Sequence, residues 1–278
     1  MNQKYSTLIV KITEGIVHVT INRPQSLNAL SREVISDLEQ VLQEILQART
    51  ESPHTVQGVI LCGSGDKAFV AGADIKQMST MTPEEGDAFG KQMHAVTLQL
   101  ERLPVPVIAA VDGFALGGGC ELALACDFIY ATTSSMFGQP ETKLGLIPGF
   151  GGTVRLQQRI GIGRARELIY TGRMITADQA HRQGLVNSVY ATQPDVLAAA
   201  QETLRLIAAN SQAAIAISKR VVNEVQGLNT VDGLGREASA FKEAFTTPEM
   251  REGTRAFCAK EEPRFRTPLA AKGSHRTG

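Results

Sequence analysis

Hydrophobic and polar positions follow two different periods at the start of the chain. Residues 6–12 and 16–22 are rich in Val, Ile and Thr and flank a Thr-Glu-Gly turn, which predicts a β-hairpin. Residues 31–49 instead place apolar side chains three and four positions apart, and Ser31 can cap the first turn. The pattern therefore predicts two strands followed by an amphipathic helix.

Strand-like and helix-like stretches alternate through the middle of the chain. A second helix is predicted after Thr82, because Pro83 suits the first helical position and Glu85 completes a capping box; it ends before Pro104. Three short apolar runs predict buried strands: 56–63, 107–111 and 127–132. Alternation continues to about residue 190, which predicts an α/β fold with largely parallel strand pairing.

The pattern changes after Thr192 and becomes helical throughout. Helices with short breaks are predicted in four stretches: 195–209, 211–225, 230–245 and 248–260. We therefore expect a core of residues 1–200 that carries the active site and a C-terminal helical region of residues 201–266. Residues 267–278 are set apart as a tail, because the final Gly-Ser-His-Arg-Thr-Gly resembles a cloning remnant.

Composition narrows the class of protein. Of 278 residues, 43% are hydrophobic and 20% charged, which suits a sizeable buried core. Lysine plus arginine and aspartate plus glutamate both number 28, so the zero net charge argues against nucleic acid or an anionic membrane as main partner. The N-terminus carries no secretory core, and the four cysteines form no CxxC pair. A reduced, cytoplasmic setting is expected.

Familiar catalytic motifs are mostly absent. Residues 63–68, Gly-Ser-Gly-Asp-Lys-Ala, fit a dinucleotide-binding pattern, but no amphipathic helix follows and the acid expected about 20 residues later is missing. A turn at a strand end explains them better. The sequence holds no GxSxG or HExxH motif, its histidines are scattered, and no metal site is predicted. His94 is interpreted as a surface or packing residue.

The stretch 113–126, "GFALGGGCELALAC", places a lone acid just behind three glycines. Glu121 can stabilise the start of its own helix or serve a function, and the residue alone favours neither. Without side chains, Gly117 to Gly119 let a ligand approach the free N–H groups of a helix start, which suit an oxygen that gains negative charge. Gly118 and Glu121 share one helical face, so an amide donor and a carboxylate base are predicted about one turn apart.

Two further segments bear on this hypothesis. Residues 71–73, Ala-Gly-Ala, follow a strand end and offer a second exposed amide, so two donors from separate strand ends can clamp one carbonyl oxygen. Glu141 follows Glu121 by twenty residues within "FGQPETKLGLIPG". Alone, it is better explained as a loop acid beside Pro140.

Together these segments resemble the enoyl-CoA hydratase/isomerase family, the crotonase group. The order and spacing of the matching stretches agree along nearly the whole chain. The stretches are "GSGDKAFVAGADIKQM", "PVIAAVDGFALGGGCELALACDFIYAT", "FGQPETKLGLIPGFGGTVRL" and "ELIYTGRMITADQAHRQGLVN". The resemblance implies an α/β, crotonase-like spiral of ββα turns. It also implies a C-terminal helical trimerisation region that assembles homotrimers, often paired into hexamers.

The resemblance also implies a substrate and its contacts. The substrate is an acyl-CoA thioester, so coenzyme A belongs to the substrate and no separate cofactor is expected. The amides of Ala73 and Gly118 form the oxyanion hole for the thioester oxygen. By the family's pattern the CoA and substrate contacts are Ala71, Ala73, Asp74, Ile75, Lys76, Gly118 and, near the CoA phosphates, Lys260.

Within the family, the two acids imply the reaction. Hydratases carry glutamate at both the Glu121 and Glu141 positions, whereas isomerases generally keep one acid or place it elsewhere. The resemblance therefore implies a 2-enoyl-CoA hydratase in which Glu121 deprotonates the attacking water and Glu141 delivers a proton to C2. The alternatives are a Δ3,Δ2-enoyl-CoA isomerase, another crotonase-family lyase, an RNA-binding member and a non-catalytic assembly protein. The acyl-chain length and the pathway stay open.

Overall fold

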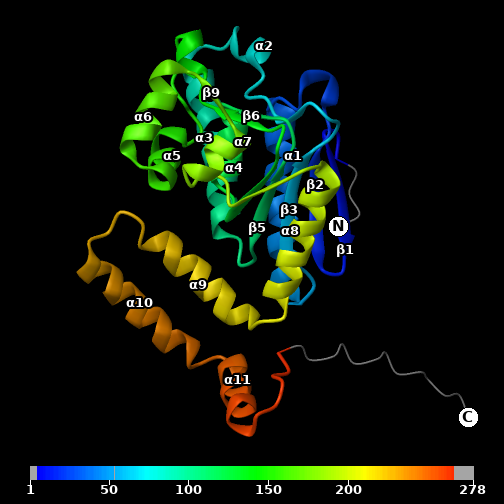
Figure 1. Cartoon of the computed structure of the whole chain (residues 1–278), viewed down its shortest axis with the longest axis vertical. Helices are drawn as coiled ribbons and strands as arrows, with labels where there is room; N and C mark the ends of the chain where they lie inside the picture. Colours follow the sequence, from blue (N-terminus) through cyan, green and yellow to red (C-terminus); the bar gives the residue numbers. More distant parts are fainter. Residues whose placement is uncertain (1–4, 53, 266–278) are drawn as a thin grey trace, which may run out of the picture. The chain divides into compact units, whose positions relative to one another are not determined.

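The computed structural model describes residues 5–52 and 54–265 (Figure 1). The chain divides after Leu206 into two compact units, an α/β unit and a helical one. Residues 267–278, which the sequence sets apart as a tail, lie outside the described residues. Each described helix is too short or too polar to traverse a lipid bilayer.

A six-stranded sheet runs through the first unit. Its strands, in spatial order, are β1 (Leu8–Thr13), β2 (Ile16–Ile21), β3 (Gly58–Gly63), β5 (Val107–Val111), β7 (Phe128–Thr132) and β10 (Ser188–Tyr190). The first pair is the predicted antiparallel hairpin, and every later pairing is parallel. β3 and β5 are buried along their whole length, as expected for strands covered on both faces.

A second sheet of four very short strands accompanies the first. Its order is β4 (Ala68–Val70), β6 (Phe114–Leu116), β8 (Met136–Gly138) and β9 (Met174–Thr176). The hydrophobic pattern did not predict these strands, because three residues are too few to display a period of two. Three times in succession, a strand of the large sheet is followed by one of the small sheet and then by helix. This is the expected spiral of ββα turns.

The two long helices of this unit start and end for the predicted reasons. α1 (Arg32–Glu51) is capped by Ser31, whose side chain accepts from the amide of Val34. α3 (Pro83–Arg102) begins with the predicted capping box between Thr82 and Glu85. The large apolar side chains of α1 are buried except that of Leu46, which is exposed.

Shorter helices connect and cover the strands. They are η1 (Pro24–Ser26), α2 (Ile75–Met78), α4 (Gly118–Leu124), η2 (Glu141–Leu144), α5 (Gly152–Ile160), α6 (Ile162–Thr171), α7 (Ala177–Arg182) and α8 (Gln193–Ala208). The core between them is dense and aliphatic, and it includes the thiols of Cys120 and Cys126. Burial raises the pKa of the Cys120 thiol, with further help from the nearby charges of Glu121 and Glu141, so this thiol stays protonated.

The second unit is helical, as the sequence predicts. It contains α9 (Gln212–Glu224), α10 (Thr230–Ala244) and α11 (Pro248–Ala259). Ser211, Asn229 and Thr247 cap these helices by accepting a hydrogen bond from a first-turn amide. Several large apolar side chains remain exposed on this unit: Val222, Leu228, Val231, Leu234, Phe241, Phe245 and Phe257.

Candidate active site

Three loops meet because three short strands run parallel. β4, β6 and β8 pair in that order and in the same direction, so their carboxyl ends share one edge of the small sheet. The loop after β4 carries residues 71–73, Gly117 joins β6 to Gly118 at the start of α4, and the loop after β8 leads to Glu141. In parallel sheets this edge is where ligands bind.

A cavity of about 490 Å³ opens at this edge. Its wall combines apolar side chains with Glu121, Glu141 and backbone from glycine-rich loops. The lining residues are Ala71, Gly72, Ala73, Ile75, Met78, Gly86, Asp87, Phe89, Gly90, Lys91, His94, Gly117, Gly118, Glu121, Pro140, Glu141, Leu144, Leu146, Ile147, Gly149 and Phe150. A largely apolar pocket with a few convergent polar groups has the character of a small-molecule site.

Glu121 lies in the first turn of α4 with 1% of its surface exposed. One carboxylate oxygen accepts hydrogen bonds from the amides of Phe150 at 2.8 Å and Gly152 at 2.7 Å. These donors come from the start of α5, so the acid is held by a neighbouring helix N-terminus and not by its own. Phe150 is itself packed edge-on against Phe89 of α3.

Burial dominates the protonation of Glu121. It raises the pKa to about 7, and the charge of Glu141 acts in the same direction. The amides of Gly152 and Phe150 and the guanidinium of Arg155 oppose the shift, because each favours the ionised carboxylate. Glu121 can therefore hold or release a proton near neutral pH.

Glu141 begins η2, and the buried amide of Gln139 faces it. With its nitrogen turned toward the carboxylate, this amide donates to both oxygens, at 2.9 and 3.2 Å. Burial also raises the pKa of Glu141. A Cβ at Gly152 would lie 2.8 Å from the Gln139 amide and 2.9 Å from the Glu121 carboxylate, so both acids have Gln139 as a neighbour.

Ala73 and Gly118 both line the cavity. Within residues 5–52 and 54–265, the N–H groups of Ala73 and Gly118 donate to no other group. Gly118 opens α4, where the first amides have no partner within the helix. Gly117 shapes this start, because its φ of 50° and ψ of −123° suit glycine, and a Cβ there would lie 2.8 Å from a Glu141 oxygen.

The arrangement places two hydrogen-bond donors and two titratable acids around one apolar cavity. Donors fixed in advance can stabilise negative charge that develops on a bound oxygen. Carboxyl groups with raised pKa values can exchange protons with a neighbouring carbon or water at neutral pH. Proton transfer next to a polarised carbonyl group is therefore the chemistry that this geometry suits.

Comparison with known proteins identifies the family of this chain. Residues 11–268 match the family model for enoyl-CoA hydratase/isomerase. A short-chain-enoyl-CoA hydratase of Clostridium acetobutylicum is 43% identical, over 92% of this chain and 96% of the relative. The chain belongs to the enoyl-CoA hydratase/isomerase family.

Other relatives in this family extend the similarity. A crotonyl-CoA hydratase of Syntrophomonas wolfei is 40% identical, over 94% of this chain and 98% of its own length. The crystal structure of an enoyl-CoA hydratase from Bacillus anthracis superimposes with a TM-score of 0.86 at 38% identity, covering 93% of this chain and 98% of that one. The crotonase-like fold expected from the sequence is confirmed.

Not every residue that the family resemblance singled out lies on the cavity wall. Ala71, Ala73, Ile75 and Gly118 do. Asp74 lies outside the lining, where its carboxylate caps α2 and pairs with Arg23. Lys76 is exposed and also outside the lining. Lys260 follows α11 as its C-cap in the helical unit, and its contact with CoA phosphates stays a prediction.

Several groups that contact or influence Glu121 and Glu141 were not predicted from the sequence. The amides of Phe150 and Gly152, the Gln139 side chain and Arg155 all act on the two acids, yet no local motif marks them. Arg155 pairs with Glu101 through two hydrogen bonds of 2.6 and 3.0 Å and donates to the carbonyl of Phe150 at 3.3 Å. His94, interpreted as a surface or packing residue, is exposed and lines the cavity.

Proposed function

We propose that this protein catalyses the reversible hydration of trans-2-enoyl-CoA thioesters to 3-hydroxyacyl-CoA. One observation carries the proposal: Glu121 and Glu141 line one cavity together with Ala73 and Gly118, whose amides have no acceptor among residues 5–52 and 54–265. Two acids serve hydration, because the reaction adds a hydroxyl group at one carbon and a proton at the next.

In the proposed reaction the thioester oxygen accepts hydrogen bonds from the amides of Ala73 and Gly118. These bonds polarise the conjugated system and make C3 electrophilic. As charge moves onto the oxygen, the same bonds strengthen, so they favour the transition state over the bound substrate. A single donor of this kind typically contributes about 10²–10³ in rate.

The two acids then complete the addition. Glu121, ionised, takes a proton from water as the water oxygen bonds to C3, and the electron pair of the double bond moves toward the thioester oxygen. Glu141, protonated, gives its proton to C2 as the carbonyl re-forms. Glu121 ends protonated and Glu141 ionised, so a proton must return from Glu121 to Glu141 before the next forward cycle. Dehydration runs the same steps in reverse with the two roles exchanged.

The environment of the acids supports these roles. A carboxylic acid with an ordinary pKa near 4.3 is almost fully ionised at neutral pH and is a poor proton donor. Burial raises the pKa of both residues, to about 7 for Glu121. The charge of Glu141 also raises the pKa of Glu121, so an ionised Glu141 disfavours ionisation of Glu121.

The cavity suits the acyl group of a CoA ester. Its side-chain lining is mainly apolar, with Met78, Phe89, Leu144 and Ile147 among the contributors. The named relatives include a short-chain-enoyl-CoA hydratase and a crotonyl-CoA hydratase, which makes crotonyl-CoA the first substrate to test. The proposed reaction uses water and the two acids and calls for no cofactor beyond the CoA ester.

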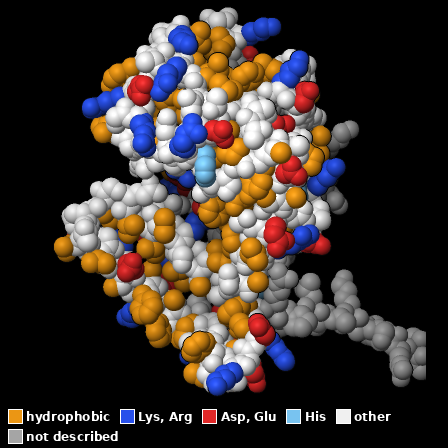
Figure 2. Space-filling view, viewed as in Figure 1, with side chains coloured by type: hydrophobic (Ala, Val, Ile, Leu, Met, Phe, Trp, Pro, Cys, Tyr) orange, Lys and Arg blue, Asp and Glu red, His pale blue; other side chains and the backbone are white. Residues whose placement is uncertain are grey.

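We further propose that the helical unit assembles the chain into trimers or pairs of trimers in the cytoplasm. Figure 2 shows apolar side chains gathered over this unit, and seven large ones between Val222 and Phe257 are exposed. Apolar patches of this kind mark protein contacts. The mass of the full chain in solution, measured by light scattering, tests the assembly. A monomer at micromolar concentration contradicts it.

Loss of the enoyl absorbance of crotonyl-CoA tests the reaction. We expect turnover by the wild type and losses of at least about 100-fold in kcat for Glu121→Gln and Glu141→Gln, because each variant lacks one proton-transfer group. A 3-enoyl-CoA ester serves as the second substrate, since an isomerase moves one proton between C2 and C4. Near-wild-type hydration by both variants overturns the assigned roles. Faster turnover of the 3-enoyl ester by the wild type identifies an isomerase instead.

A further inference from the structure

The backbone groups on either side of the Ala73 amide form hydrogen bonds with Leu30, and this leaves the Ala73 amide directed away from Leu30. The amide of Leu30 donates to the carbonyl of Gly72, and the amide of Asp74 donates to the carbonyl of Leu30, both at 2.9 Å. Leu30 and Ala73 thus form a parallel bridge. In extended backbone, alternate residues direct their N–H groups to opposite sides, so the Ala73 amide is turned away from the Leu30 segment.

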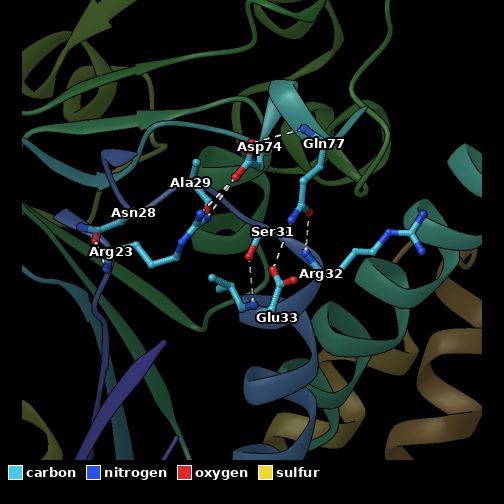
Figure 3. Close-up of polar contacts among 9 residues, drawn as sticks. Arg23, Asn28, Ala29, Ser31, Arg32, Glu33, Asp74 and Gln77 are labelled. Atoms are coloured by element: carbon cyan, nitrogen blue, oxygen red, sulfur yellow. Dashed lines mark hydrogen bonds and ion pairs between the residues drawn. The ribbon is translucent and has the colours of Figure 1, made fainter. Parts of the chain in front are cut away.

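A partly buried ion pair between Arg23 and Asp74 links the two segments of this bridge. The Arg23 guanidinium donates to the Ala29 carbonyl at 2.8 Å and, through two nitrogens, to one Asp74 oxygen at 3.2 Å each. Only 21% of the Arg23 side chain and 15% of the Asp74 side chain are exposed. The guanidinium therefore joins the residue before Leu30 to the residue after Ala73, on both strands of the bridge (Figure 3).

Gln77 extends this network of contacts from Asp74 to the first turn of α1. Asp74 caps α2 by accepting from the Gln77 amide at 3.4 Å. The Gln77 side chain accepts from the Arg32 amide at 3.0 Å and donates to Glu33 at 3.2 Å, so α2 is tied to the first turn of α1 (Figure 3). The Arg23 contacts act on the residues next to the Leu30–Ala73 bridge, whereas the Gln77 contacts join α2 to α1. Arg23 and Asp74 themselves lie outside the cavity lining.

We propose that Arg23 is a positioning residue for hydration: through Asp74 and the Ala29 carbonyl, it holds the Ala73 amide in the direction that meets the thioester oxygen. This inference rests on the proposed function, because it assumes that Ala73 is an oxyanion donor. The amide is main chain, so no side chain at residue 73 can aim it. A charge-assisted contact with a planar guanidinium supplies directional restraint that a single neutral hydrogen bond supplies less well.

Three variants separate positioning from stability. Arg23→Met removes the guanidinium, Arg23→Lys keeps the charge but loses the forked contact, and Asp74→Asn keeps a good helix cap but loses the charge. Arg205→Met is the matched control. It breaks an ion pair of 2.9 Å with Glu14 in the same unit, and those side chains are 49% and 61% exposed.

Two readouts are needed, crotonyl-CoA kinetics and the infrared carbonyl stretch of bound butyryl-CoA labelled with ¹³C at the thioester carbon. Butyryl-CoA has no double bond, so it binds without reacting. In the wild type we expect the stretch to fall below its value in free butyryl-CoA. In Arg23→Met and Asp74→Asn we expect it to move back toward the free value, with kcat lower by about 10–100-fold and KM within about threefold. Arg23→Lys should lie between, and Arg205→Met should match the wild type.

The outcomes distinguish the inference from the function on which it rests. If the wild type itself leaves the carbonyl stretch unshifted, the proposed oxyanion hole is wrong. If the wild type lowers the carbonyl stretch and Arg23→Met matches the wild type in both kcat and carbonyl stretch, the positioning role of Arg23 is refuted. The proposed hydration is unaffected by that result. Equal losses of kcat and thermal stability with an unchanged carbonyl stretch also refute it. If Arg23→Met does not fold, Asp74→Asn carries the same test.

Discussion

The amide of Gly152 donates to the carboxylate of Glu121 at 2.7 Å across 31 positions of sequence. Together with the Phe150 amide, it makes the start of α5 the anion-binding end for an acid on α4. Burial favours the protonated form of Glu121, and these amides favour the ionised form. The balance keeps the acid ready to change state at neutral pH.

Replacing Gly152 should disturb this contact with little effect elsewhere. A Cβ at Gly152 would lie 2.9 Å from a Glu121 oxygen and 2.8 Å from the Gln139 amide, so both side chains must move. We expect Gly152→Ala to lower kcat with crotonyl-CoA by about 10–100-fold while circular dichroism stays unchanged. Gly163→Ala in α6 is the control, because nothing lies within 4 Å of its Cβ. Equal kinetics for the two variants would contradict the proposed importance of the contact.

The pH dependence of stability should report the raised pKa of Glu121. A carboxyl group with a raised native pKa binds more protons when folded than when unfolded, so stability falls as pH rises from about 4.5 to about 7. The neutral Glu121→Gln variant lacks this loss. Relative to wild type, it should gain up to about 3 kcal/mol in free energy of unfolding between pH 5 and pH 8. Urea denaturation at both pH values measures it, and a constant difference would place the native pKa near its ordinary value.

Arg155 should set the acid limb of the activity profile. Its positive charge lowers the pKa of Glu121, and its side chain is mostly buried against Glu101. Arg155→Met should therefore shift the acid limb of kcat/KM, which reports the free enzyme, to higher pH. Arg173→Met, which breaks an exposed pair with Glu167, is the control. If Arg155→Met lowers kcat/KM without moving the acid limb, Arg155 does not set the pKa of Glu121. Its role is then to hold the backbone at Phe150.

Two glycines of α3 leave room in the cavity. Gly86 and Gly90 both line it one turn apart; a Cβ at Gly86 meets nothing within 4 Å, and one at Gly90 meets only the Gly149 carbonyl, at 3.7 Å. Gly90 lies in the interior of α3, where glycine costs about 1 kcal/mol relative to alanine, and no close packing around it explains this cost. We infer that the open space accommodates longer acyl chains.

Filling that space should change chain-length preference. For Gly90→Leu we expect kcat/KM to fall by at least about 10-fold more for a ten-carbon than for a four-carbon enoyl-CoA, because overpacking excludes the longer chain. A series of trans-2-enoyl-CoA esters of increasing length measures this, with Gly163→Leu as the control outside the cavity. An equal loss at every length would assign Gly90 to helix packing alone.

Much of the fold could be predicted because its signals are local. The caps at Ser31 and Thr82 and the fully apolar strands β3 and β5 each express themselves within a few residues. The three-residue strands β4, β6 and β8 do not, because pairing with neighbours defines them and their own sequence does not. These are the strands that bring the site loops together.

The parts of the site that could be predicted also have local sequence signals, and the parts that were missed depend on contacts between distant residues. Glu121 and its glycines are conspicuous because an acid in an apolar stretch and three consecutive glycines are both locally unusual. The Phe150 and Gly152 amides lie 29 and 31 residues from Glu121 in sequence, and a backbone donor has no residue type of its own. The Arg23–Asp74 pair spans 51 positions and depends on a loop fold that hydropathy does not encode.

The amides of Ala73 and Gly118, which have no acceptor in the described part of the chain, belong to the main chain, whereas both proton-transfer groups are side chains. In the proposed mechanism, main-chain groups therefore bind the thioester oxygen and side chains transfer the protons. A protein that carries both Glu121→Gln and Glu141→Gln would still bind and polarise the thioester through these amides, but it would not catalyse hydration. Such an inert variant would be a ready starting point for installing other acid–base pairs, and with them other reactions of acyl-CoA esters.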